Sequence, residues 1–295
     1  MTQETDKRFT GRLAAGAAVV CWSIGNVVVA RLELPGIEIA FWRQIVGALV
    51  YGSIFFLSGR RITWKLVKLI FPVAVLFSSE VAVFFTALEA TTVANATIIG
   101  ALQPILLLFV ARGKFGEVVS KRLIGISLFA VAGVALVVLG SSDETTWSPR
   151  GDLLALLAMV LFSAYFVVVK STRSKIDTFT LQTVAMCIGS ILLLPFVLII
   201  RGTASFPSLS WKELLWILFL LAVPGSGHFL MNWAHLHISL SLAGLLMLAV
   251  PVLSAVGAYL FLEQGISMLQ IVGATVVLGA LAIVVKEDIE SKTGP

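Results

Sequence analysis

Glu80 is the single charged residue of the stretch 69–88. Phe84 follows four residues later, so a helix would carry a carboxylate and an aromatic ring on one face. An ionisable group in apolar surroundings is costly and usually faces a partner or a polar cavity. Two interpretations follow. Glu80 binds the ammonium group of a ligand or takes up a proton, or it is a hydrogen-bonding hub between helices.

A second polar stripe contains His228, Asn232 and His235, which follow one another at helical spacing. His228 and Asn232 predict a polar wall opposite Glu80, or else hydrogen bonds between packed helices. His235 lies near a loop, so we expect it at the membrane interface. Two histidines and an asparagine could bind a metal ion, but no acidic or thiol ligand lies nearby, and we predict no metal site.

Aromatic residues recur at two matching places in the chain. Trp22 and Asn26 share a helical face of one apolar stretch, and Phe162 and Tyr165 hold the corresponding place in another. Tryptophan is less common in the middle of such a stretch than at its end. These side chains therefore predict a surface that stacks on a planar or apolar ligand, or ordinary helix packing.

Two prolines, Pro104 and Pro251, stand inside apolar stretches. Proline removes a backbone donor and frees a carbonyl, so both predict a hinge or a fixed kink. Gln103 directly precedes the first proline, and Met247, a soft and adaptable contact, precedes the second by four residues; both are predicted to face a ligand. Arg43 stands six residues into another stretch, close enough to the outer side to reach it. We expect it to pair structurally there, or else to bind the substrate.

The composition requires lipid around these elements. Of 295 residues, 59% are hydrophobic and 13% are charged, and the mean hydropathy is +1.03. A soluble domain carries roughly 25% charged residues. The net charge of +5 belongs to loops that face an anionic leaflet, and no nucleic-acid partner is expected. Cys21 and Cys187 lie in apolar runs and are predicted to be buried thiols.

Ten stretches reach the roughly 20 apolar residues that a bilayer crossing requires. They cover about 12–31, 37–59, 66–87, 92–111, 121–140, 151–170, 178–200, 211–234, 238–262 and 268–285. The sequence thus predicts an all-α integral membrane protein with ten transmembrane helices. Most lysines and arginines lie in loops on the side of the two termini, which the positive-inside rule assigns to the cytoplasm.

The chain contains an internal repeat. Residues 86–106 align with 233–253 at an offset of 147, and the two prolines coincide in this alignment. CWSIGNVVVAR at 21–31 matches LFSAYFVVVK at 161–170 in the same way. The halves, 1–145 and 146–295, hold five spans each. Because five is odd, the second half must insert upside down, and inverted repeats build a substrate site near the bilayer midplane.

Several features occur together: two inverted sets of five spans, Trp22-Ser23 in the first span, Phe162-Ser163 in the sixth, Phe41-Trp42-Arg43 in the second, and a proline followed by Glu in the fourth and ninth. In these features the chain resembles the drug/metabolite transporter superfamily, in its ten-span EamA-type branch, over nearly its whole length. It looks most like bacterial amino-acid exporters, such as the aromatic amino-acid group. The resemblance implies a basket-shaped bundle whose central cavity is lined by spans 1, 3, 4, 6, 8 and 9.

Some mechanisms have no support in the residues. No nucleotide-binding loop of the form G-x-x-x-x-G-K-[ST] is present, so ATP-driven transport is excluded for this chain. No catalytic triad or metal spacing predicts an enzyme, and no cofactor is expected. Small four-span multidrug exporters, which the same superfamily is thought to include, use a glutamate in the first span; here that span has none. If protons drive transport, Glu80 or His228 must carry them, and facilitated transport is equally compatible.

The sequence therefore predicts a secondary transporter that exports amino acids or related small metabolites across the bacterial inner membrane. The alternative is efflux of hydrophobic cationic drugs by the same fold. Transport would proceed by alternating access, with Pro104 and Pro251 as hinges. The predicted substrate-binding residues are Trp22, Asn26, Glu80, Phe84, Gln103, Phe162, Tyr165, His228, Asn232 and Met247.

Overall fold

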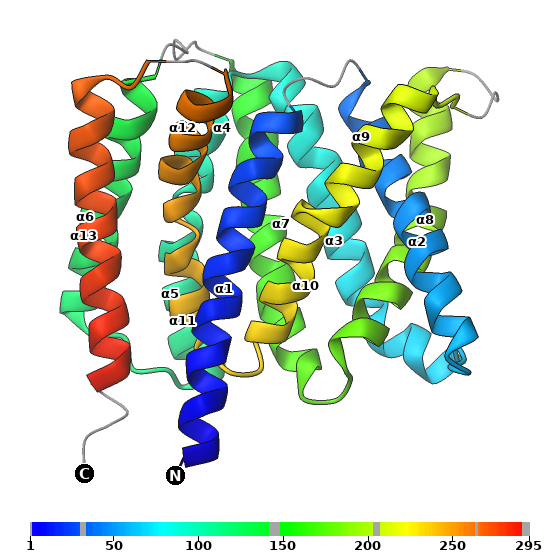
Figure 1. Ribbon diagram of the computed structural model, residues 1–295, viewed down its shortest axis with the longest axis horizontal. Helices are drawn as coiled ribbons and strands as arrows, with labels where there is room; N and C mark the ends of the chain where they lie inside the picture. The colour runs from blue at the N-terminus through cyan, green and yellow to red at the C-terminus, as the bar shows by residue number, and fades with distance from the viewer. Residues whose placement is uncertain (1, 30–33, 142–147, 203–206, 263–264, 291–295) are drawn as a thin grey trace.

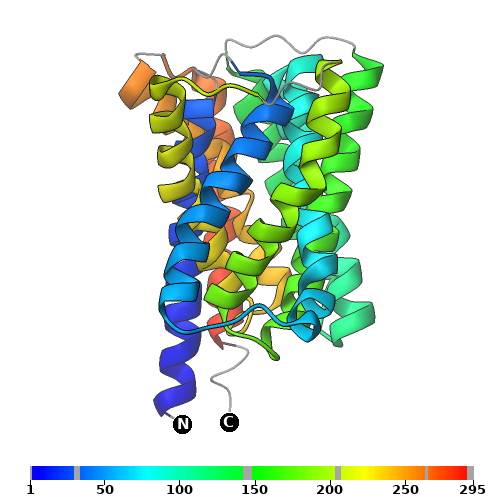
Figure 2. The ribbon, with the colours of Figure 1, turned by 90° about the vertical axis from the view of Figure 1, so that its right-hand side faces the viewer.

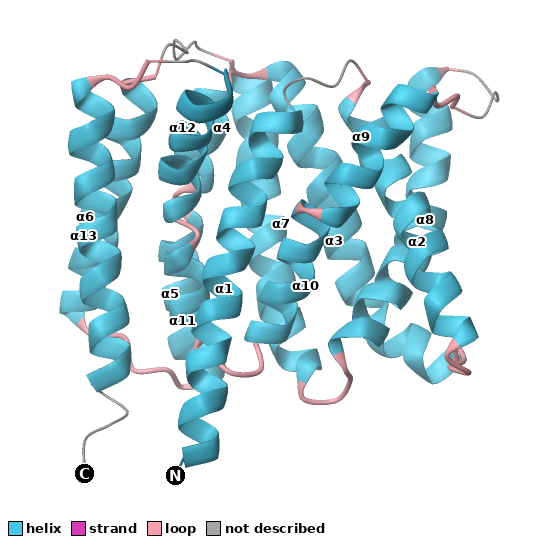
Figure 3. Ribbon diagram, viewed as in Figure 1, coloured by secondary structure: helices cyan, strands magenta, loops and turns pink. Residues whose placement is uncertain are grey.

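The computed structural model describes residues 2–29, 34–141, 148–202, 207–262 and 265–290, and every regular element in these ranges is an α-helix (Figure 3). The helices are α1 (Thr2–Val29), α2 (Gly36–Leu57), α3 (Trp64–Ala90), α4 (Val93–Gly100), α5 (Gln103–Phe115), α6 (Lys121–Leu139), α7 (Pro149–Arg173), α8 (Thr178–Arg201), α9 (Trp211–Ala222), α10 (Pro224–Ala234), α11 (Leu240–Leu246), α12 (Ala249–Leu262) and α13 (Met268–Glu290).

Nine stretches of the described residues are long and apolar enough to cross a membrane. They correspond to every predicted span except the first, which falls in α1, a helix of 28 residues that packs along α10 and α12. The predicted all-α membrane class is confirmed. α1 begins and α13 ends at the same end of the bundle (Figure 1). That this end faces the cytoplasm stays a prediction.

Three of the predicted spans are interrupted near their middle. The span 92–111 divides into α4 and α5, 211–234 into α9 and α10, and 238–262 into α11 and α12. Pro104 and Pro224 each stand in the first turn of the second helix. In the first turn of a helix the backbone N–H groups have no acceptor within the helix, so the missing N–H of proline removes no hydrogen bond there. Inside one long helix a proline would remove a backbone hydrogen bond. Pro104 and Pro251, where the sequence predicted a hinge or a kink, lie just after two of these breaks, whereas the break before Pro224 was not predicted.

Polar side chains at the loops fix where several helices begin. Thr63, Ser120 and Asp177 each accept a hydrogen bond from the backbone N–H three residues later. Ser210 and Glu213 form a reciprocal capping box at the start of α9. The first N–H groups of a helix have no partner within it, so such caps stabilise each helix end where it leaves the membrane.

The main helix pairs join the two predicted halves. α1 lies along α10 and α3 along α7, while α2 packs on α8 and α6 on α13 (Figures 1 and 2). Exchanging the halves converts the first pair into the second and the third and fourth pairs into themselves, as the predicted two-fold repeat requires. The predicted boundary at residues 145 and 146 lies outside the described residues, and the division into halves stays a prediction.

Glycines allow two of these pairs to approach closely. A Cβ atom on Gly25 of α1 would lie 2.5 Å from Pro224 Cγ, and one on Gly227 of α10 would lie 3.0 Å from the Ala18 carbonyl oxygen. Where α6 meets α13, a Cβ on Gly273 would lie 2.6 Å from the Gly133 carbonyl oxygen. Small residues at such contacts are typical of membrane helices, whose association depends on close packing.

Candidate functional site

A cavity of about 200 Å³ lies among the central helices. Its wall includes residues of α1, α3, α7, α10 and α12, and of the break between α4 and α5. These elements belong to spans 1, 3, 4, 6, 8 and 9, the set that the family resemblance implied. Arg43 adds the second span to the wall. The structure brings these sequence-predicted residues together at the cavity: Trp22, Glu80, Phe84, Gln103, Pro104, Phe162, His228, Met247 and Pro251.

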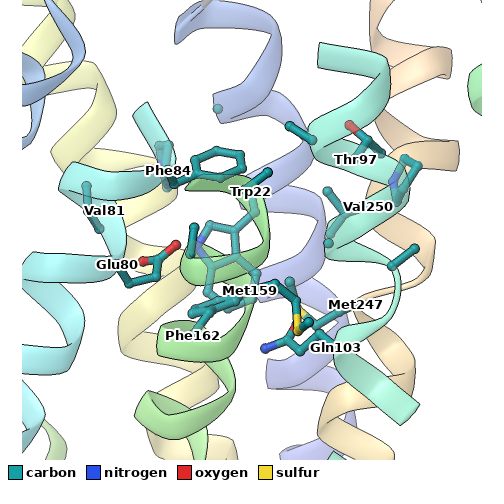
Figure 4. A pocket seen from close by; sticks show the side chains of 18 of the residues that line it. Trp22, Glu80, Val81, Phe84, Thr97, Gln103, Met159, Phe162, Met247 and Val250 are labelled. Atoms are coloured by element: carbon teal, nitrogen blue, oxygen red, sulfur yellow. The ribbon is translucent and has the colours of Figure 1, made fainter. Parts of the chain in front are cut away.

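Glu80 supplies the acidic side chain of the cavity wall. It projects from the middle of α3 and is only 8% exposed (Figure 4). Phe84, one turn further along α3, lines the same cavity. No ion pair within 4.0 Å is formed by Glu80 among the described residues. A buried carboxylate that forms no ion pair is costly, so this position favours a cationic ligand or a bound proton.

The aromatic wall is built by equivalent residues of the two predicted halves. The rings of Trp22 and Phe162 meet edge to face with their centroids 6.0 Å apart. The imidazole of His228 packs 4.9 Å from the Trp22 ring, also edge to face. The hydroxyls of Ser23 and Ser163, the next residue in each half, donate to the carbonyls of the residues four positions earlier. The repeated aromatic-serine motif thus places a ring from each half at the cavity.

The opposite wall is formed where two helices are interrupted. Gln103 and Pro104 follow the break between α4 and α5, and Met247 lies in the break between α11 and α12 (Figure 4). Pro251 is the third residue of α12, where its missing N–H leaves no acceptor unpaired. Non-helical backbone inside a membrane protein is tolerated where it lines a cavity or is buried in protein, and both breaks border the cavity.

Tyr165 and Asn232 are not among the residues that line the cavity. Their contact with substrate stays a prediction. The Tyr165 hydroxyl donates to Asn232 Oδ1 at 2.8 Å, and Asn232 Nδ2 donates to Gln182 Oε1 at 3.0 Å. Asn232 is fully buried. Both side chains therefore serve an internal polar network that joins α7, α8 and α10.

This network helps to close the cavity toward one end of the bundle. α3 runs away from the end that holds the termini, whereas α7 and α10 run toward it (Figure 1). Phe77 precedes Glu80 on α3, and Tyr165 and Asn232 follow the cavity residues on α7 and α10. All three are at most 2% exposed. The Phe77 ring stacks on the Tyr165 ring at 5.4 Å. A packed layer therefore separates the cavity from the terminal end.

His235 was expected at the interface, but it is 1% exposed. Its ring centroid lies 4.7 Å from the centroid of the Phe166 ring. Burial, with the nearby charges of Lys170 and Arg173, lowers the pKa of His235 to about 3, so the ring is neutral. His235 directly follows α10, and its ring is covered by α7 where exposure at the interface was expected. The side chain of Asn26 lies outside the described residues.

Arg43 lies deeper in the protein than the sequence predicted. Structural pairing near the outer side or substrate binding was expected; the side chain is 6% exposed and lines the cavity. Its guanidinium lies 5.7 Å from the centroid of the Phe77 ring. α2 begins at Gly36, so seven residues at 1.5 Å each place Arg43 about 10 Å inside the helix. That depth was the available signal.

The described residues contain no group of three His, Cys, Asp or Glu side chains that could hold a metal ion.

The comparisons with known proteins decide the class. The sequence model of the EamA-like transporter family matches residues 9–139 and 149–286. This chain belongs to the EamA-like transporter family. It is a multi-pass membrane transporter of the drug/metabolite transporter superfamily, and it is not an enzyme.

Individual relatives agree with this assignment. An uncharacterized transporter of Archaeoglobus fulgidus is 26% identical over 259 residues, which cover 86% of this chain and 90% of that protein. A solved crystal structure matches the fold with a TM-score of 0.77 and 19% sequence identity, over 96% of this chain and 99% of the other. At that identity the structural likeness supports the fold alone.

Proposed function

We propose that this EamA-family protein is a secondary transporter of amino acids, including aromatic or other neutral ones, or of closely related small metabolites. One observation carries the proposal: the cavity combines a single carboxylate, Glu80, with a wall of aromatic rings. A ligand with an ammonium group and an apolar side chain suits such a site, because each part meets a complementary surface.

The binding mode follows from where the side chains lie. The ammonium group would face Glu80, and the apolar side chain would lie against Trp22, Phe84 and Phe162. These rings and the carboxylate border the same space (Figure 4). The opposite wall, with Gln103, presents an amide to the polar end of the ligand. Burying an aromatic side chain contributes about 1.5–3 kcal/mol, so the rings would select for apolar substrates.

Transport would proceed by alternating access, with the two halves rocking about the central cavity. The breaks beside Pro104 and Pro251 are proposed as hinges, since an interrupted helix can bend without losing a continuous hydrogen-bond ladder. The packed layer of Phe77, Tyr165 and Asn232 would have to open for the substrate to pass. We place the protein in a bacterial inner membrane with both termini in the cytoplasm, and the direction of transport is export.

A second function is favoured by the same carboxylate. A hydrophobic cation could neutralise Glu80 and stack on the Trp22 and Phe162 rings. This drug-efflux alternative differs from the first in one testable respect, because a quaternary ammonium dye has no carboxylate. An excess of phenylalanine, threonine or methionine would block transport of an amino acid, and an excess of the dye would block transport of a drug.

The proposal is tested by flux into liposomes that contain the purified protein. A panel of labelled amino acids is measured with and without a pH gradient. Saturable flux of at least one amino acid, absent from protein-free liposomes, is the expected result. Acceleration by the gradient would assign proton coupling, for which Glu80 and His228 are the candidate carriers, and equal flux without it would assign facilitated transport. Flux of the quaternary ammonium dye alone would overturn the amino-acid proposal.

A further inference from the structure

The cavity wall contains more hydrogen-bond donors than the protein satisfies. Four buried polar atoms in it have no hydrogen-bond partner among the described residues: Trp22 Nε1, Arg43 Nη2, Gln103 Nε2 and His228 Nδ1. Their side chains are 3–8% exposed. The indole, guanidinium and amide nitrogens can only donate. An unsatisfied buried donor is costly. A ligand that brings hydrogen-bond acceptors into the cavity would remove this cost.

Arg43 is the strongest of these donors because it carries a full charge. No carboxylate within 4.0 Å forms an ion pair with it among the described residues. Its guanidinium lies over the Phe77 ring, which offers a π face and no carboxylate. A guanidinium presents a planar fork of N–H groups that matches the two oxygens of a carboxylate. An anionic group in the ligand would therefore fit this position best.

Glu80 borders the same cavity but does not neutralise Arg43 by direct contact. The two opposite charges attract each other, yet they are held apart without an ion pair. Two charges of opposite sign therefore border one cavity without forming an ion pair. A zwitterion in this cavity would satisfy both charges at once, which neither a simple cation nor a simple anion could do.

We propose that Arg43 binds the carboxylate of the substrate and thereby makes the cavity selective for acids over their uncharged analogues. This inference rests on the proposed function, in which Glu80 faces the ammonium group of the substrate. It adds a binding partner for the carboxylate of the same substrate. Of the two roles that the sequence left open for Arg43, structural pairing and substrate binding, it selects the second. Trp22 and Gln103 would contribute neighbouring N–H donors, since each lines the same space with an unpartnered nitrogen.

The experiment uses two ligand pairs that differ only in the acidic group. Phenylalanine is compared with phenylalaninamide, and phenylacetate with phenylacetamide, by the concentration dependence of thermal stabilisation of the full chain in detergent. The wild-type protein should bind each carboxylate about tenfold or more tightly than its amide, the size expected for a charged hydrogen bond. Arg43→Gln should remove this preference, and Arg43→Lys, which keeps the charge but not the fork, should retain part of it.

The control is Arg122→Gln, because Arg122 is exposed and pairs with Glu287. It should leave the preference intact. A purely structural role of Arg43 would weaken the acid and the amide equally, so an unchanged ratio in Arg43→Gln overturns the inference. If Arg43→Gln does not fold, the wild-type ratio and Arg43→Lys still decide, since a wild-type protein without carboxylate preference also overturns it. Arg43-dependent binding of phenylacetate without binding of phenylalanine would instead overturn the amino-acid proposal alone.

Discussion

Glu117 anchors the short helix α11 to the loop after α5. Its carboxylate accepts hydrogen bonds from Leu240 N at 2.6 Å, Ser241 N at 3.0 Å and Ser241 Oγ at 2.7 Å. The two backbone donors belong to the first turn of α11, where the helix dipole favours a negative charge. α11 has 7 residues, too few to be stable alone. We therefore predict that Glu117 keeps this helix folded.

Glu117→Ala removes all three hydrogen bonds. At about 1 kcal/mol each, with a further contribution from the dipole, the local opening free energy of α11 should fall by about 2–4 kcal/mol. Each 1.36 kcal/mol is a factor of ten, so the protected amides of α11 should exchange roughly 30- to 1000-fold faster. Hydrogen–deuterium exchange with mass spectrometry on the purified protein measures this change.

The matched control is Glu213→Ala, which removes the same kind of cap from α9. It should accelerate exchange in α9 and leave α11 unchanged. Met247 directly follows α11 and lines the cavity, so Glu117→Ala should also lower transport. Identical exchange of α11 in the wild type and in Glu117→Ala would refute the anchoring role.

Three other changes give separate tests. Gly25→Val should lower the thermal stability, because a Cβ would lie 2.5 Å from the Pro224 ring, whereas the same change at Gly52, where a Cβ meets nothing within 4 Å, should not; equal melting temperatures would contradict the packing argument. Asn232→Ala leaves the buried side chains of Tyr165 and Gln182 without this hydrogen-bond partner. The free energy of unfolding should fall by about 2–4 kcal/mol, and the substrate preference should not change. A changed preference would indicate that Asn232 contacts the substrate. Burial raises the pKa of Asp177, but hydrogen bonds from the first turn of α8 and from a guanidinium outweigh burial and hold it below the ordinary 3.8. The melting-temperature advantage over Asp177→Asn should therefore be full above about pH 5 and fade as the pH falls through the lower folded value; an advantage that grows in acid would contradict this sign.

Periodicity and hydropathy were enough to predict the helices, and the family was predicted from the resemblance of the repeated motifs. A span needs a fixed length of apolar residues, and the halves repeat the same aromatic-serine and proline positions. The spacing also predicted which helical face carries Glu80, Trp22 and His228. All three side chains border the cavity.

Depth along a helix was harder to predict than the face. Asn232 shares a face with His228, but it lies one turn beyond the end of the cavity and pairs with Tyr165 instead. Arg43 was assigned to the interface because charged residues near span ends usually reach water, yet neighbouring helices cover it. The positions of helix breaks depend on the packing around each proline, which one sequence does not contain.

The most direct test of the central claim is flux of a transported amino acid into liposomes that contain Glu80→Gln or His228→Ala protein, at matched amounts of correctly folded protein. The account predicts that Glu80→Gln loses most of the flux, because the ammonium group would lose its counter-charge, and that His228→Ala is also impaired, because the ring packs on the Trp22 wall. Amino-acid flux at the wild-type rate in both variants would contradict the proposal that the central cavity binds the substrate.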